Sequence, residues 1–101
     1  MNKEVIPVDE AVVCGIQLKD EAYKALLDVH SSLLESHAGD ADASFMDSPV
    51  VRRFQEEIAG AKAAWDRAKD AMLRENVPAG RRGSVRDWTL DYGLCELTII
   101  Y

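Results

Sequence analysis

The chain has 101 residues, of which 48% are hydrophobic and 30% are charged, and its formal net charge is −6. This length suits one modest core, but it excludes a cofactor domain joined to a substrate domain, and the composition excludes a wholly disordered chain. No apolar run approaches the ~20 residues of a membrane-spanning helix, and the first residues hold no signal-peptide core. We therefore expect a single domain over residues 1–101, a cytoplasmic location and no membrane partner.

Residues 1–19 are expected to contain a loose lead-in and then a short strand over Ala11–Leu18. A repeat of two in hydrophobicity predicts a strand because successive side chains of a strand point to opposite faces. The repeat here consists of four apolar residues, namely Val12, Cys14, Ile16 and Leu18.

Residues 20–38 are predicted to form the first helix, which begins with two acidic residues suited to the positive end of a helix. Its apolar stripe consists of Tyr23, Leu26, Leu27, His30, Leu33, Leu34 and His37. The opposite side carries Glu21, Asp28 and Glu35 at intervals of seven residues. The helical rise places these three carboxylates roughly 10 Å apart along one face.

The acidity of the chain is concentrated in this helix and in the loop that follows it. Residues 20–47 contain seven acids and one base, and the loop contributes Asp40, Asp42 and Asp47. Such a face is either simply solvated or a docking surface for a basic protein, since clustered charge raises the association rate with an oppositely charged partner. The loop is not a calcium site because the required glycine and the distal glutamate are missing.

Residues 48–76 are predicted to form a long helix, with Ser48 as its N-cap and Pro49 at its first position. Apolar residues recur at alternating intervals of three and four, which indicates an unbroken seam along one side. The seam consists of Val51, Phe54, Ile58, Ala61, Trp65, Ala68 and Met72. Its partner is either the first helix, in a helical hairpin, or a second subunit.

Residues 77–84 are expected to be a linker, and residues 85–101 a C-terminal strand or hairpin. Alternation is interrupted at Gly93, so the segment is either one bulged strand or a hairpin, and we favour the hairpin. Three arginines in this region are candidate anion contacts, although they make no nucleic-acid footprint without net positive charge. They are Arg81, Arg82 and Arg86.

These elements together predict an α+β fold, with an antiparallel helical hairpin packed on a small antiparallel sheet from the N- and C-terminal strands. The alternative is a mainly α protein that dimerises into a four-helix bundle with β tails.

The sequence contains no pattern typical of a catalytic, cofactor or metal site. His30 and His37 are seven residues apart, which is too far for one metal on a single helix. Cys14 and Cys95 are expected to be buried small hydrophobic residues rather than a disulfide framework. We therefore expect neither an enzyme, a cofactor nor a bound metal.

Three hypotheses of function remain, in order of preference. The first is a non-enzymatic protein-binding module, such as an inhibitor of a nucleic-acid-handling protein, that docks on a basic protein surface through the acidic helix and loop without binding nucleic acid directly. The second is a homo-oligomeric assembly protein, such as a homodimer, that uses the long seam (Val51, Phe54, Ile58, Trp65 and Met72) or the C-terminal strand. The third is a small ligand-binding protein or enzyme with His30, Cys14 or Tyr92 in a pocket.

Overall fold

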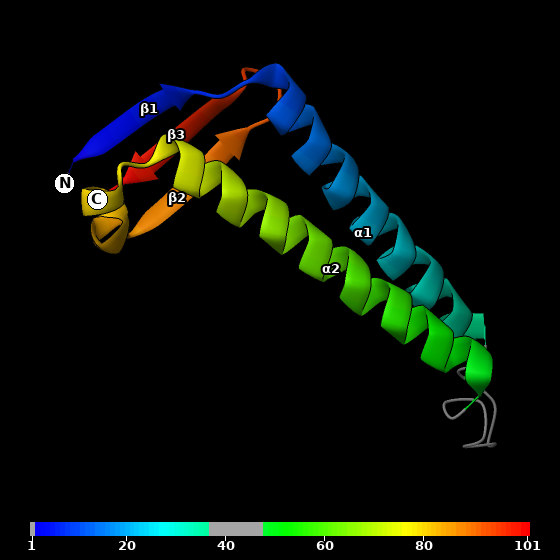
Figure 1. The fold of residues 1–101 in the computed structure, drawn as a ribbon. Helices are drawn as coiled ribbons and strands as arrows, with labels where there is room; N and C mark the ends of the chain where they lie inside the picture. Colours follow the sequence, from blue (N-terminus) through cyan, green and yellow to red (C-terminus); the bar gives the residue numbers. More distant parts are fainter. Residues whose placement is uncertain (1, 37–47) are drawn as a thin grey trace. The chain divides into compact units, whose positions relative to one another are not determined.

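The computed structural model describes residues 2–36 and 48–101 and has an α+β fold. The described residues form a three-stranded antiparallel sheet and two long helices (Figure 1). The elements follow one another in the order β1 (Lys3–Pro7), α1 (Glu10–Ser36), α2 (Pro49–Asn76), the 3-10 helix η2 (Ala79–Ser84), β2 (Asp87–Asp91) and β3 (Glu96–Ile100). The predicted fold class is confirmed.

The chain divides into two compact units, and both long helices run through the two of them. The sheet unit comprises Met1–Leu18 and Asp66–Tyr101, and it contains all three strands. The hairpin unit comprises Lys19–Trp65, and it contains the remainder of α1 and α2. Each unit is described separately below.

The sheet has the order β1-β3-β2, so the last strand of the chain lies in the middle (Figure 1). Both neighbours are antiparallel to β3, with Ile6 and Leu90 each opposite Leu97. The β2 and β3 strands form a hairpin whose connection covers residues 92–95. The hairpin predicted for residues 85–101 is therefore confirmed, and the bulged single strand is excluded.

The two faces of β3 differ in burial within the sheet unit. Leu97 and Ile99 on β3 are fully buried, whereas Glu96, Thr98 and Ile100 on the other face remain partly exposed. The buried apolar side chains of this unit are Val8, Val13, Ile16, Met72, Val77, Leu97 and Ile99. These residues come from the start of α1, the end of α2, the central strand and the adjoining turns, which all belong to the same compact unit.

The segment Ala11–Leu18 is helical, which contradicts the strand predicted there. Asp9 precedes the helix, and its carboxylate accepts a hydrogen bond from the backbone N–H of Ala11 at 3.0 Å. This contact satisfies one of the N–H groups that a helix leaves unpaired at its start, so α1 begins about ten residues earlier than predicted. Val13 and Ile16 then lie on one side of the helix, because a spacing of three residues is close to one turn.

The N-terminal strand is Lys3–Pro7, in the segment predicted to be a loose lead-in. The backbone oxygen of Asn2 accepts from Tyr101, and the N–H of Val8 donates to Cys95, so alternate residues of β1 bond to β3. Pro7 falls between them, with its nitrogen on the outer edge, where no N–H is required. A proline at this position also discourages pairing with another chain.

The hairpin unit is held by contacts between α1 and α2. The rings of Tyr23 and Trp65 lie 5.8 Å apart between centroids with an interplanar angle of 30°, a favourable aromatic arrangement. Val51 is fully buried, and Phe54 and Ile58 are partly buried. The side-chain oxygen of Ser48 accepts from the N–H of Val51 at 3.3 Å, as expected for the predicted N-cap.

Candidate functional site

Three carboxylates form a row on the solvent side of α1 in the hairpin unit. We call Glu21, Asp28 and Glu35 the acidic row; all three residues are exposed. Helical geometry separates neighbouring members by roughly 10 Å. Asp40, Asp42 and Asp47, which were predicted to extend this surface, lie outside the described residues.

Asp20 does not belong to the exposed acidic surface, although it contributes to the charge of the same segment. It is only 5% exposed, and Lys24 Nζ lies 3.2 Å from its carboxylate oxygen Oδ1. The spacing of four residues, with the acid first, is the favourable order for such a pair on a helix. Its charge therefore acts within the hairpin unit rather than on a partner.

An apolar stripe runs beside the acidic row, and the sequence analysis missed it. We call Ala22, Ala25 and Val29 the outer stripe; all three residues are exposed, and Val29 is 50% exposed. The intervals of three and four residues that identify this stripe are present in the sequence. They were overlooked because the larger residues of the inner face dominate the hydrophobic pattern of this helix.

Two of the three arginines proposed as anion contacts, Arg81 and Arg82, have different partners within the fold. Arg81 Nη1 lies 3.2 Å from Glu4 Oε2, and its guanidinium carbon lies 3.9 Å above the centre of the Tyr101 ring. The hydroxyl of Tyr101 donates to the same glutamate oxygen at 3.2 Å. Burial raises the pKa of Tyr101, and Arg81 opposes that rise. Arg81 thus links β1, η2 and the last residue of the chain.

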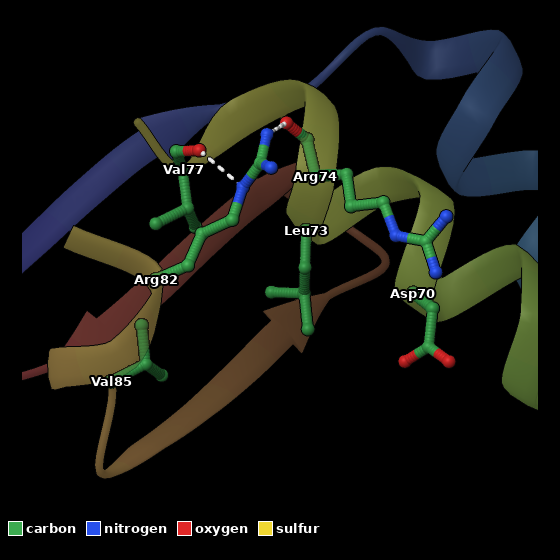
Figure 2. Close-up of a pocket in the computed structure, with 6 residues that line it drawn as sticks. All are labelled: Asp70, Leu73, Arg74, Val77, Arg82 and Val85. Carbon is green, nitrogen blue, oxygen red and sulfur yellow. Dashed lines mark hydrogen bonds between the residues drawn. The ribbon is translucent and has the colours of Figure 1, made fainter. Parts of the chain in front are cut away.

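Arg82 caps the carboxyl end of α2. Its Nε donates to the backbone oxygen of Val77 at 3.1 Å, and its Nη2 donates to the backbone oxygen of Arg74 (Figure 2). These carbonyls belong to the end of the helix, where backbone oxygens lack partners and the dipole favours a cation. Arg86 is exposed and does not line the pocket described next.

A pocket of about 250 Å³ lies where α2 meets η2, inside the sheet unit (Figure 2). Leu73, Val77 and Val85 supply its apolar wall. Asp70, Arg74 and Arg82 supply polar groups, so charges of both signs line it. Its volume is below the range of ~300–1,000 Å³ that is usual for ligand pockets.

The histidines and cysteines are spread over different parts of the fold. His30 Nε2 is buried and has no hydrogen-bond partner among the described residues, and His37 lies outside them. Cys14 is exposed, which contradicts the expected burial, and Cys95 is partly exposed; both thiols are free. Burial, followed by the nearby Glu10 carboxylate, raises the pKa of Cys95. Within residues 2–36 and 48–101, no group of three or more such side chains is arranged to hold a metal ion.

Two surfaces proposed for self-assembly are at least partly covered within the chain. Val51 and Met72 of the seam are fully buried, and Trp65 packs on Tyr23. The apolar C-terminal strand is β3, which pairs on both sides with β1 and β2. It therefore has no free edge that could extend the sheet into a second copy.

Comparison with known proteins gives no relative for this chain. No protein family, curated protein or solved structure matches it significantly. Among the described helices, none is both long and apolar enough to cross a membrane. The proposal of function below therefore rests on the residues and their geometry alone.

Proposed function

We propose that the protein is a non-enzymatic binding module that docks on a basic protein surface through the acidic row of α1. The observation that carries this proposal is the exposure of Glu21, Asp28 and Glu35 at seven-residue intervals along one helix. A rigid helix holds the three charges at fixed separations, so a partner with matching cations meets them without ordering a loop.

Electrostatic attraction between such surfaces raises the association rate and favours one partner over others. Many basic protein surfaces bind the phosphates of nucleic acids through lysine and arginine. A row of carboxylates on a helix competes for the same cations. We therefore propose an inhibitor of a nucleic-acid-handling protein as the biological role.

The test is capture of partners from a host lysate at low and at high salt, with the wild type and with a charge-reversed variant. The variant carries Glu21→Lys, Asp28→Lys and Glu35→Lys. We expect a basic partner that the wild type binds and high salt releases, and a loss of affinity of at least about tenfold in the variant.

A matched control reverses three exposed acids of α2, namely Glu56, Glu57 and Glu75, and so changes the net charge by the same amount. We expect this control to keep the partner. Equal loss of binding in both variants would show that only net charge matters, and unchanged binding in the α1 variant would refute the acidic row as the docking surface. Displacement of a DNA or RNA oligonucleotide from the captured partner tests the inhibitor role.

A further inference from the structure

We infer that the partner element is a basic amphipathic helix, which packs along the outer stripe of α1 and directs its cations at the acidic row. This inference rests on the proposed function and adds the shape of the partner. Two features of the hairpin unit carry it: an exposed apolar face on α1, and the position of the carboxylates relative to that face.

The apolar face is wider than the outer stripe itself. Ala22, Ala25 and Val29 are exposed, and Leu26 and Leu33 beside them are only partly buried. A solvated helix face usually carries charged residues, and an apolar side of this kind is typical of a helix that contacts another element. The alanines leave little bulk between the helix axis and an approaching partner, so a second helix can pack closely.

The acidic row lies along one flank of this face. Glu21 immediately precedes Ala22, and Asp28 immediately precedes Val29, which places each carboxylate about 100° around the helix from the neighbouring stripe residue. In pairs of packed helices, charged residues at the equivalent flanking positions select the partner and its orientation. The acidic row and the outer stripe both follow the repeat of a helix. A partner helix has the same repeat and can contact both along its length, whereas a strand has a repeat of two and cannot.

The other long helix lacks the exposed apolar face of α1, although α1 also exposes two bases, Lys19 and Lys24. Within the hairpin unit, the exposed side of α2 carries charges of both signs, at Arg52, Arg53, Glu56, Glu57 and Lys62. Its exposed apolar residues Val50 and Ala59 are nine positions apart, and therefore lie on opposite sides of the helix. No apolar face comparable to that of α1 exists on this part of α2.

Charge argues against an antiparallel second copy of the chain as the occupant. In an antiparallel symmetric pair, each residue row meets the same row of the other copy, so the carboxylates of the two acidic rows would face each other. Like charges at such flanks disfavour pairing. A helix with lysine or arginine on the facing flank fits both features of α1.

The experiment uses the full chain and two synthetic peptides of about four heptads each. The first peptide carries leucine on one face and lysine on its flanks. The second has the same composition in a shuffled order, so that it has no apolar face. Affinity is measured by fluorescence anisotropy, and helix formation in the peptide by circular dichroism. We expect the patterned peptide to gain helicity on binding and to bind at least about tenfold more tightly than the shuffled one.

Variants of the protein locate the binding face without changing its charge. Ala25→Gln with Val29→Gln should weaken binding of the patterned peptide by at least about tenfold. The matched control is Val50→Gln with Ala59→Gln, which changes the same residue types at exposed positions of α2 and should leave binding unchanged.

The outcomes separate this inference from the proposed function. Equal binding of both peptides, with loss in the charge-reversed variant, overturns the helix inference and supports the acidic row as a docking surface. Unchanged binding in the Ala25 and Val29 variant also overturns the helix inference. Failure of the patterned peptide, while the wild type still captures a salt-released partner from lysate, overturns the helix inference alone.

Discussion

The helices α1 and α2 have 27 and 28 residues and bury similar apolar faces, yet their exposed sides differ. In the hairpin unit, α2 exposes acids and bases without an apolar stripe, whereas α1 exposes an apolar stripe with carboxylates along one flank, together with Lys19 and Lys24. The charged side chains on the exposed side of α2 are well solvated by water. The exposed side of α1 leaves apolar surface in contact with water beside a row of carboxylates, and the proposed docking surface rests on this feature of α1.

The comparison teaches that burial alone does not distinguish the two helices. Ile16 on α1 and Met72 on α2 are equally well buried, and both serve the core of the sheet unit. What distinguishes the helices is the chemistry of the residues that the core does not use. Substitutions can test whether the buried faces of α1 and α2 contribute equally to stability, and whether Arg82 stabilises the end of α2.

The largest change in the free energy of unfolding is expected for substitutions on the buried faces of α1 and α2. Ile16→Ala and Met72→Ala should each lower the free energy of unfolding by about 3 kcal/mol, because each removes a fully buried side chain and leaves a cavity. Urea denaturation followed by circular dichroism measures both. The exposed substitutions Val29→Gln and Val50→Gln should each change stability by less than about 0.5 kcal/mol. A small loss for Ile16→Ala beside a large loss for Met72→Ala would show that the two helices are not equivalent inside.

A smaller effect is expected at the end of α2, which Arg82 caps. Arg82→Ala should lower the free energy of unfolding by about 1–2 kcal/mol, because two backbone carbonyls lose a charged donor. Arg82→Lys should recover only part of this loss, because one ammonium group does not reproduce the geometry of the guanidinium. Arg86→Ala is the matched control and should have little effect; an equal loss there would refute the capping role.

The smallest change in the free energy of unfolding, and the only increase, is expected for a substitution of His30 on α1. His30→Leu should raise the free energy of unfolding by about 1 kcal/mol, because it replaces a buried nitrogen that has no partner among the described residues. His30→Gln serves as the control, since it keeps polar atoms at this position and should give no gain. Destabilisation by His30→Leu would mean that the imidazole forms a hydrogen bond in the native protein.

Much of the fold was predictable where local and long-range signals agree. Ser48 and Pro49 mark the start of α2, and the regular seam identifies the residues that face inward. The slip of hydrophobic alternation at Gly93 indicates the β2–β3 turn. There Asp91 Oδ1 accepts from the N–H of Leu94 at 2.9 Å, and Cys95 rather than the glycine adopts the left-handed conformation, with φ of 51°.

The strand predicted at Ala11–Leu18 was wrong because the hydrophobic residues there fit both the repeat of a strand and the repeat of a helix. Ile16 satisfies both the alternation of a strand and the three-residue spacing from Val13 in a helix, and the weight of the β-branched residues favoured the strand. The N-cap at Asp9 was the overlooked signal. The true strand β1 is a short edge strand that contains Lys3 and Pro7, so its sequence carries little of the pattern that marks a buried strand.

The candidate site was only partly predictable. The interval of seven residues between Glu21, Asp28 and Glu35 was visible in the sequence, and all three are exposed. The roles of Arg81 and Arg82 were not visible, because their partners Glu4, Tyr101 and the α2 carbonyls are brought to them only by the fold. Proximity in sequence made these arginines resemble one anion site, whereas each holds a different part of the sheet unit.

The central position of β3 also determines the order in which the sheet can form during synthesis. Lys3 pairs with Ile100 and Pro7 with Glu96, so β1 leaves the ribosome 89 to 97 residues before its partner residues. At typical translation rates this delay is on the order of ten seconds. During that interval β1 has no strand to join, because β2 and β3 are both made at its end, whereas the contacts between α1 and α2 in the hairpin unit close over shorter stretches of chain. The contacts between α1 and α2 can therefore form before the sheet exists.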